Sequence, residues 1–393
     1  MNFRTRIFTF TAVATAAIVG ACGGGSGSAD SGTMRLALTD APTCGYDHVN
    51  VTVQKVRVHK SATAAETDDG WSEVVLSPAQ RIDLLALTNG VLAELGQTAL
   101  PTGKYTQMRL VLAANDAGNA FANSITPTAG TETALTTPSG AQTGLKMNID
   151  IDVAAGKVAD FVLDFDACKS FVKLGNSGQY LLKPVVAVIP RIADAGGRVI
   201  GYVAPALVGT ATSVSVQASG AAVRTTPPDS NGKFVLYPVP VGSYDLVVNA
   251  PGRATATITG VPVTDSAYTY VNTATSLIDP PTSTMHIASG TVTTAGVAPI
   301  AATVTAIRKY TNGPSVLVAA APVDGSTGVF SYSLPASAPV KTSYVAAASS
   351  ISFTADAATP TGKYTLSATA DPVTKTADID ISTADSTTTM FGF

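Results

Sequence analysis

Residues 145–153 read LKMNIDIDV, and apolar and polar side chains alternate along this stretch without a break. Every second side chain is apolar, which is typical of a β-strand with one buried and one solvated face. Residues 161–165 repeat the pattern, with Phe161, Leu163 and Phe165 as the apolar set. Runs of period two recur along the chain, and they predict a mainly all-β fold of tandem β-sandwich domains.

Other segments between residues 32 and 192 extend this prediction. Residues 34–38 and 49–58 are expected strands, and the apolar phase slips at Gln54 and Lys55, which indicates a bulge or break. The nearly continuous apolar run 180–189 predicts a central strand. A short helix is expected around 81–87, before a stop at Thr88-Asn89-Gly90. Residues 113–144 are polar and small, and are expected to form a long surface loop or a decorated hairpin.

The amino terminus predicts a bacterial lipoprotein signal peptide over residues 1–21. Arg4 and Arg6 precede an uncharged apolar run at 7–19, and Gly20-Ala21 lead directly into Cys22. The run has the length of a signal-peptide core and is too short for a mature membrane helix. Cys22 is therefore the expected lipidation site, and several acyl chains would make a stable anchor. The alternatives are an ordinary secretory signal with an incidental cysteine, or an uncleaved membrane helix.

Residues 22–31 are rich in Gly and Ser and are expected to form a flexible tether. No Asp follows Cys22, so we expect an extracytoplasmic, membrane-anchored protein, sorted to an outer membrane where the organism has one and facing either the periplasm or the surface. Loss of Arg4 and Arg6 with the signal peptide would shift the formal net charge from −3 to −5. This weak acidity argues against a nucleic-acid partner.

Two cysteines remain besides Cys22, namely Cys44 and Cys168. An even pair in an oxidising compartment favours a disulfide, worth roughly 4–5 kcal/mol for a loop of this length in the chain-entropy model. Two buried free thiols are the alternative. Neither cysteine has a second Cys or His at the spacing of zinc ligands, so a metal site is not expected there.

Several short motifs between residues 32 and 192 occur in an order that resembles a known family. They are LTDAP at 38–42, VNVTV at 49–53 with VRVH at 56–59, DLL at 83–85 with TNG at 88–90, LPTGKY at 100–105 with RL at 109–110, FDA at 165–167 and LKP at 182–184. This series resembles the bacterial lipoprotein domain of unknown function 4382 (DUF4382). The resemblance implies an extracytoplasmic β-rich domain and implies no activity.

Residues 195–278 resemble the carboxypeptidase regulatory-like, or transthyretin-like, β-sandwich modules. The motifs are GRVIG at 197–201, DSNGKF at 229–234, PVGSY at 240–244 and APG at 250–252. Asp229 offers an Asx-turn, Gly232 is free to take a positive φ, and Phe234 would fill the core. The resemblance implies an accessory sandwich without a zinc motif or a peptidase activity.

Residues 285–393 contain a weaker echo of the same order, beginning with GTV at 290–292 and GVF at 328–330. We expect a second, divergent sandwich here, in which an insertion around 335–359 or an unrelated hairpin delays the PTGKY motif at 360–364. Pro-x-Gly-x-Tyr thus occurs at 101, 240 and 360. A turn-to-strand device common to sandwiches explains this better than true tandem repeats, which need more matching positions.

Catalytic motifs are sparse. The three histidines are His48, His59 and His286, and the chain contains no H-E-x-x-H, nucleophile elbow or phosphate loop. The acidic strands are the one constellation to weigh, with Asp150 and Asp152 on one face and Asp160, Asp164 and Asp166 on another. Asp150, Asp152, Asp164 and Asp166 are weak calcium candidates, because same-face neighbours on a strand lie about 7 Å apart. A solvated face that discourages edge aggregation is the simpler interpretation.

These observations favour a lipid-anchored envelope protein with a non-catalytic binding or structural role, such as adhesion or matrix attachment. We expect no enzymatic activity and no cofactor. Its partners would be the membrane, through the lipid, and an envelope protein or polysaccharide. A carbohydrate- or calcium-binding surface module is the second hypothesis, and a hydrolase is the third. Trp71 is the only tryptophan, which weakens the sugar-platform and glycosidase interpretations.

Overall fold

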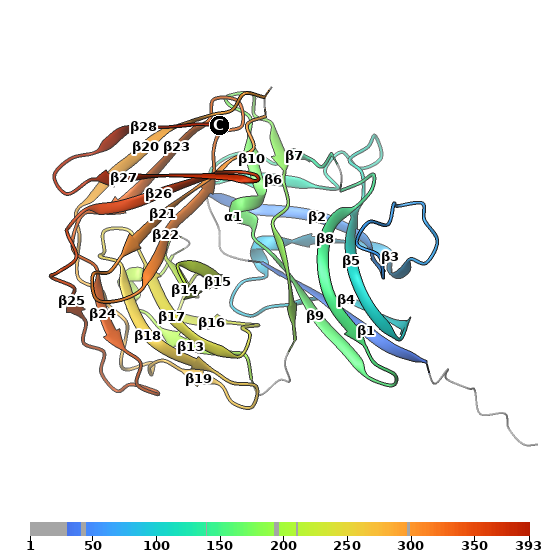
Figure 1. Cartoon of the computed structure of the whole chain (residues 1–393), viewed down its shortest axis with the longest axis horizontal. Helices are drawn as coiled ribbons and strands as arrows, with labels where there is room; N and C mark the ends of the chain where they lie inside the picture. Colours follow the sequence, from blue (N-terminus) through green and yellow to red (C-terminus); the bar gives the residue numbers. More distant parts are fainter. Residues whose placement is uncertain (1–29, 41–44, 139, 192–195, 210, 297–298) are drawn as a thin grey trace, which may run out of the picture.

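The protein is described by a computed structural model that covers residues 30–40, 45–138, 140–191, 196–209, 211–296 and 299–393. The architecture is nearly all β, as the alternating sequence pattern predicted. The buried apolar side chains form three main clusters, which lie mostly within residues 34–182, 199–278 and 288–391. We call the corresponding parts of the chain the first, middle and third units, and Figure 1 shows the three side by side.

The first unit contains two sheets. Its smaller sheet has the order β12-β9-β1-β4, and its larger sheet has the order β10-β11-β7-β6-β2-β5-β8, with β3 paired to β2. The elements are β1 (Ser31–Asp40), β2 (Tyr46–His59), β3 (Ser72–Asp83), η1 (Leu84–Ala86), β4 (Ala93–Pro101), β5 (Gly103–Leu112), β6 (Ser124–Pro127), β7 (Thr133–Thr136), β8 (Leu145–Val153), β9 (Val158–Phe165), α1 (Ala167–Ser170), β10 (Phe171–Lys173), β11 (Tyr180–Leu182) and β12 (Val186–Pro190).

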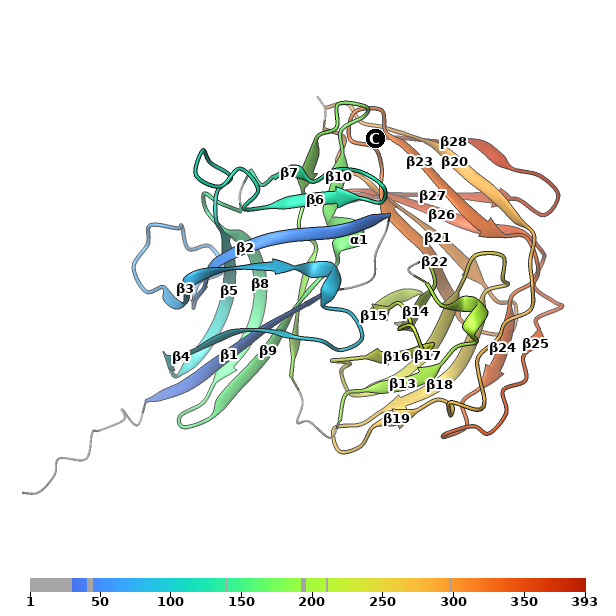
Figure 2. The same cartoon turned by 180° about the vertical axis from the view of Figure 1, so that it is seen from behind.

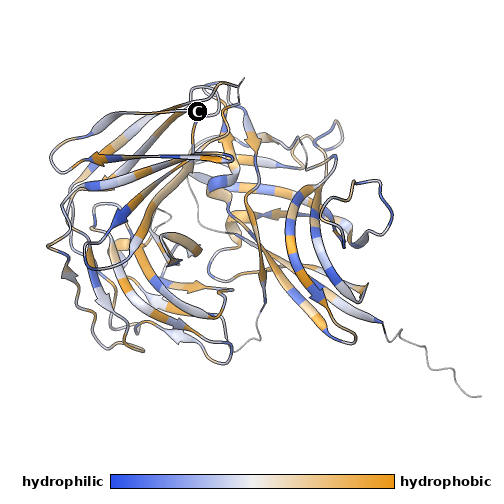
Figure 3. Ribbon diagram, viewed as in Figure 1, coloured by the Kyte–Doolittle hydropathy of each residue, from blue (hydrophilic) through white to orange (hydrophobic). Residues whose placement is uncertain are grey.

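The alternating stretch 145–153 forms β8, and Leu145, Met147, Ile151 and Val153 are buried. Figure 3 shows the same alternation as bands of opposite hydropathy along the long strands of this unit. The expected phase slip in β2 is also confirmed, since its register with β3 and β5 shifts between Val53 and Lys55. The bulge allows the valines on both sides of it to point into the core.

Two local predictions need correction, and a third is confirmed in one of its two alternatives. The helix expected around 81–87 is a single 3-10 turn, η1, because residues 81–83 still belong to β3. The stretch 113–144 carries the short paired strands β6 and β7, which matches the decorated-hairpin alternative. The central strand expected at 180–189 is wrong: β11 and β12 lie in different sheets, and Pro184, which has no N–H to donate, falls in the break between them.

The middle and third units share one strand order. The middle unit has sheets β16-β13-β19 and β15-β14-β17-β18, and the third unit has β23-β20-β28 and β22-β21-β26-β27. The strands are β13 (Val199–Tyr202), β14 (Ser213–Ala218), β15 (Ala221–Thr226), β16 (Lys233–Leu236), β17 (Gly242–Asn249), β18 (Ala256–Val263), β19 (Thr269–Tyr270), β20 (Met285–Thr293), β21 (Thr303–Lys309), β22 (Ser315–Pro322), β23 (Val329–Pro335), β26 (Lys363–Ala370), β27 (Val373–Asp380) and β28 (Ser386–Gly392), with a 3-10 turn η2 (Pro205–Leu207) after β13.

Matching residues occupy matching positions in the two units. Gly201 lies opposite Phe234 in the middle unit, and Gly290 lies opposite Phe330 in the third. Each phenylalanine ring passes so close to its glycine that a Cβ there would meet ring carbon within 3 Å. Residues 285–393 therefore share with the middle unit both the strand order and this close glycine–phenylalanine packing.

The third unit also lends two strands to the middle one. β24 (Val340–Ser343) and β25 (Thr354–Ala355) follow β23, and β24 pairs in parallel with β18. The middle sheet therefore grows to six strands, and Val340 joins the middle core. This excursion lies between β23 and β26, which accounts for the late arrival of the PTGKY motif.

The recurring Pro-x-Gly-x-Tyr motif makes the same contact twice. The Tyr105 hydroxyl donates to the carbonyl of Pro101 over 2.9 Å, and the Tyr244 hydroxyl donates to Pro240 over 2.9 Å. In the third unit, Tyr364 donates instead to Pro335 over 2.6 Å. In the first two motifs the tyrosine thus bonds the proline four residues earlier, where a strand begins, and we call this contact the tyrosine clasp. In the third unit the tyrosine has a different acceptor.

Candidate functional site

The predicted lipidation site, Cys22, and the predicted disulfide partner, Cys44, lie outside the described residues. Cys168 is described and lies in α1. The chain on either side of residues 41–44 contacts the surroundings of α1. The Asp40 carboxylate accepts a hydrogen bond from the backbone N–H of Ala167 over 2.9 Å, and the Tyr46 ring packs edge-on against Phe171.

The carboxylates of β8 lie on its solvated face. Asp150 is 72% exposed at its side chain and forms an ion pair of 2.8 Å with Lys104 on β5. The Asp150 hydrogen bond raises the pKa of Lys104. Asp152 lies directly opposite Lys104 in the ladder. Both carboxylates therefore face an ammonium group across the sheet.

Asp164 and Asp166 have structural partners of another kind. Asp164 on β9 is buried against Arg224 of the middle unit. Asp166 caps α1 by accepting from the Lys169 backbone N–H, and it also pairs with the Lys169 ammonium over 2.5 Å. Across the described ranges, no three His, Cys, Asp or Glu side chains are grouped in a way that could hold a metal ion. The four calcium candidates are not brought together.

Arg224 makes a buried polar joint between the first and middle units. Its side chain is 1% exposed and donates to Asp164, to the Thr39 hydroxyl over 2.7 Å and to the Asp40 carbonyl over 2.9 Å. The second carboxylate oxygen of Asp40 is buried without a hydrogen-bond partner. Burial raises the pKa of Asp40 well above its usual value. We call this cluster the Arg224 joint.

A second contact joins the first and middle units where the loop between η1 and β4 approaches β15 and β16 (Figure 2). Asn89 adopts a left-handed φ of 55°, accepts from the Val235 backbone N–H over 3.1 Å, and donates its own N–H to Thr226 over 2.9 Å. The motifs around Thr39-Asp40 and Asn89-Gly90 thus form the surface that receives β15 and β16. Sequence reasoning missed this role, because nothing in either motif points to a partner distant in the chain.

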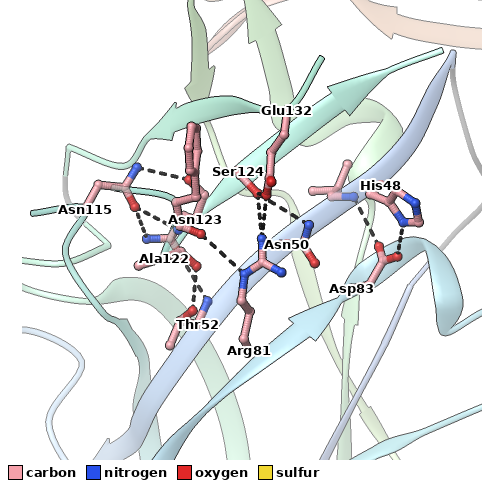
Figure 4. A network of polar contacts seen from close by, with 12 residues as sticks. His48, Asn50, Thr52, Arg81, Asp83, Asn115, Ala122, Asn123, Ser124 and Glu132 are labelled. Atoms are coloured by element: carbon pink, nitrogen blue, oxygen red, sulfur yellow. Dashed lines mark hydrogen bonds and ion pairs between the residues drawn. The ribbon is translucent and has the colours of Figure 1, made fainter. Parts of the chain in front are cut away.

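His48 belongs to the polar network drawn in Figure 4. Its Nδ1 lies 2.7 Å from Oδ2 of Asp83, and this hydrogen bond raises the pKa of His48. The other oxygen of Asp83 accepts from the backbone N–H groups of Val49 and Leu85. Asp83 therefore caps η1 and orients an exposed imidazole.

Ser124 lies in the same network but has other partners. Its hydroxyl donates to Glu132 over 2.6 Å and accepts from Arg81 over 3.0 Å and from Asn50 over 3.3 Å. Because the hydroxyl proton goes to Glu132, the network does not pair Ser124 with the His48 imidazole as nucleophile and base. The arrangement ties β6 to β2 and β3.

Trp71 is the centre of a cation–π cluster on the larger sheet. The guanidinium carbons of Arg57 and Arg109 lie 4.6 Å and 5.3 Å from its ring centroid, and the His59 ring centroid lies at 5.1 Å. The indole N–H donates to the Ala65 carbonyl over 2.9 Å. The sequence shows Trp71 to be the only tryptophan, but it does not predict the two arginine partners, because they come from different strands.

Comparison with known proteins identifies the first unit. It is an all-β unit of two sheets, and residues 31–184 match the family model described as a domain of unknown function, DUF4382. This part of the chain is a DUF4382 domain, in agreement with the resemblance found in the motifs. None of the curated proteins matches the chain.

Solved structures show only distant similarity. A type II cohesin–X-dockerin complex from Acetivibrio cellulolyticus is 28% identical over 21% of this chain and 56% of that chain, with a TM-score of 0.18. The Bacillus anthracis TIE protein is 12% identical over 93% of this chain and 51% of that chain, with a TM-score of 0.16. A streptococcal ancillary pilin is 10% identical over 92% and 99%, with a TM-score of 0.17. The matches cover little more than half of the first two chains, and scores this low carry no functional inference.

In the part of the chain that the structure describes, no helix is both long enough and apolar enough to span a bilayer.

Proposed function

We propose that this protein is a lipid-anchored component of the bacterial cell envelope, with a non-catalytic binding or structural role. The observation that carries the proposal is the bracing of all three units against one another. A tethered body with a fixed shape is suited to presenting a surface or to holding envelope components in place.

Each pair of units has its own polar brace. The Arg224 joint connects the first unit to the middle one. The Gln217 side chain exchanges two hydrogen bonds with the backbone of Leu317, at 2.9 Å and 2.7 Å, and so connects the middle unit to the third. The Gly175 N–H donates to Asp324 over 3.0 Å, which connects the first unit to the third. Three braces in a closed ring oppose hinge motion.

The proposed anchor is Cys22, followed by the Gly/Ser tether to residue 31. β1 begins at Ser31, on the side of the first unit that points away from the other two units (Figure 1). A lipid at Cys22 would leave the middle and third units projecting away from the membrane. We propose an outer-membrane location, and an envelope protein or polysaccharide as partner.

We propose that the middle and third units are carboxypeptidase regulatory-like modules. The turn at Asp229 supports this assignment, since its carboxylate accepts from the N–H groups of Asn231 and Lys233, over 2.8 Å and 2.9 Å. Gly232 takes a φ of 77°, and Phe234 is fully buried. Accessory sandwiches of this kind fit a binding role.

We also propose a disulfide between Cys44 and Cys168. It is supported by two contacts of residues that flank 41–44: Asp40 accepts from Ala167 in α1, and Tyr46 packs against Phe171, directly after α1. Mass spectrometry of the non-reduced native protein should find the two cysteine peptides linked. Alkylation of both thiols in the native protein would refute the bridge.

The anchor is tested by Cys22→Ser, with Ser28→Ala in the tether as the matched control. We expect Cys22→Ser to move the protein into the soluble fraction, while Ser28→Ala stays with the membranes. Membrane retention of Cys22→Ser would overturn the anchor.

The role is tested in intact cells by protease shaving and by crosslinking, followed by purification of the lipoprotein. Shaving together with a recovered polymer or protein would support a surface-binding role. Protection together with recovered envelope proteins would support a periplasmic structural role. Turnover of an envelope polymer or peptide by the purified protein would overturn the non-catalytic assignment.

A further inference from the structure

A pocket of about 720 Å³ opens on the first unit between β5, β8 and the chain that follows β11. Its charged lining residues are Arg109, Lys146, Lys183 and Glu66, and much of the rest is apolar. Three cations and one carboxylate leave an excess of two positive charges in the lining. The chain has a formal net charge of −3, so this local excess of positive charge is opposite in sign to the charge of the whole protein.

The cations of the pocket belong to a row that crosses the larger sheet. Arg57, Arg109 and Lys146 lie directly opposite one another on β2, β5 and β8. Like charges in directly opposed positions destabilise a sheet. Glu73 neutralises Arg57 through a contact of 2.7 Å at the far end of the row. Among the described residues, no ion pair within 4 Å involves Arg109, Lys146 or Lys183.

Arg109 is fixed in place at the base of the pocket. The residue is 8% exposed, its Nη1 donates to the Thr143 carbonyl over 2.8 Å, and its Nη2 donates to the Ala64 carbonyl over 3.0 Å. Carbonyl groups and the Trp71 ring hold the guanidinium without neutralising it. A buried cation held only by neutral partners favours an anion nearby.

Of the two remaining ionisable groups in the lining, Lys183 favours a bound anion and Glu66 opposes it only in part. Burial lowers the pKa of Lys183, so its ammonium is held there at a desolvation cost that a bound anion would offset. Glu66 contributes the only carboxylate of the lining, and its Oε2 is buried without a hydrogen-bond partner. One unpaired carboxylate cannot neutralise three cations.

We propose that this pocket binds a small organic anion, specifically a carboxylate carried on an apolar body. The cations would take the carboxylate, and the apolar body would lie against Leu145, Leu181 and Pro184. The volume is within the range of small-ligand pockets, which combine mostly apolar walls with a few polar groups.

The motifs that carry the DUF4382 resemblance meet at this pocket. Arg109 comes from the RL motif at 109–110, and Lys183 and Pro184 come from the LKP motif at 182–184. Arg57, from VRVH at 56–59, lies one strand away. Segments distant in the sequence thus supply the charges of one concave site. The proposal is independent of the lipid anchor, because the site lies within the first unit.

Binding can be measured on the full-length protein in a neutral detergent, with 4-phenylbutyrate as the probe and its uncharged amide as the comparison. Trp71 is the only tryptophan and contacts Arg109, so its fluorescence reports on the pocket, and calorimetry gives the dissociation constant. We expect the carboxylate to bind at least about tenfold more tightly than the amide, because a charge-assisted hydrogen bond is lost in the amide.

Lys146→Gln and Lys183→Gln should each weaken the carboxylate about tenfold and leave the amide unchanged. Lys157→Gln is the matched control, since this exposed lysine lies outside the pocket lining. Equal binding of acid and amide, or equal weakening by all three substitutions, would overturn the site. Loss of the membrane anchor in Cys22→Ser leaves the expected binding unaltered, so this test and that of the envelope role fail separately.

Discussion

Arg224→Met would break the joint between the first and middle units while keeping most of the side-chain volume. The wild-type guanidinium is 1% exposed and contacts Asp164, Thr39 and the Asp40 carbonyl. The substitution removes all of these donors at once. It leaves Asp164, which is itself buried, without its cationic partner.

The magnitude follows from the burial of the pair. Breaking a buried ion pair by removing one partner costs about 3–5 kcal/mol, since the other charge stays desolvated. For a cooperative unit of 150–250 residues, that loss lowers Tm by roughly 6–20 °C. The double variant Arg224→Met/Asp164→Asn should recover part of the loss, because the orphaned charge is then gone.

Urea unfolding followed by Trp71 fluorescence and by circular dichroism measures the free energy of unfolding of each variant. Arg253→Met is the control, because its ion pair with Asp279 is 2.9 Å long but its partner is 54% exposed. That exposed pair should contribute no more than about 1 kcal/mol. An Arg224→Met variant that loses no more stability than Arg253→Met would refute the reasoning.

Three further outcomes are expected from the same unfolding assay. Gly232→Ala should lower the free energy of unfolding by about 1–3 kcal/mol, because its φ is +77° and a Cβ would meet the Val203 carbonyl oxygen at 2.5 Å. Gly252→Ala is the control and should cost less, because its φ is similar but its Cβ would meet nothing within 4 Å. Tyr244→Phe should lower the free energy of unfolding by about 0.5–1.5 kcal/mol, because the hydroxyl no longer donates to the Pro240 carbonyl. A variant as stable as the wild type would show that this hydrogen bond does not stabilise the fold. Burial raises the pKa of Asp40 in the folded protein, so the folded state keeps this proton to a higher pH than the unfolded chain does. The free energy of unfolding should therefore fall as the pH rises from the usual carboxyl range towards the raised pKa. Asp40→Asn should abolish this fall, and a variant with the wild-type pH profile would contradict the raised pKa of Asp40.

Local features of the fold could be predicted from the sequence where one rule dominates. Period two identified β8, and a single phase slip located the bulge in β2, because burial of one face fixes strand register. The Asx-turn at Asp229 was likewise visible, since its geometry depends on four adjacent residues. Partners distant in the sequence could not be predicted in this way.

Asp164 shows where sequence reasoning stopped. Its strand was expected to have one wet face, but Arg224 covers that face and makes the carboxylate a structural ion pair. The anion pocket was missed for the same reason, because Arg109, Lys146 and Lys183 come together only when β5 pairs with β8 and the chain after β11 folds across them. Charge clusters of this kind are set by sheet order, which a single sequence does not specify.

The two strands that the third unit lends to the middle sheet set a practical limit on how the chain can be divided. A truncation after residue 284 would remove β24 and leave the backbone of β18 as a bare, unpaired edge. Such edges recruit strands from other molecules, so the shortened protein should self-associate. The proline-containing stretch at 279–282, between the two sandwiches, is therefore not a position at which the chain can be cut into independent domains, because the two sandwiches share one sheet.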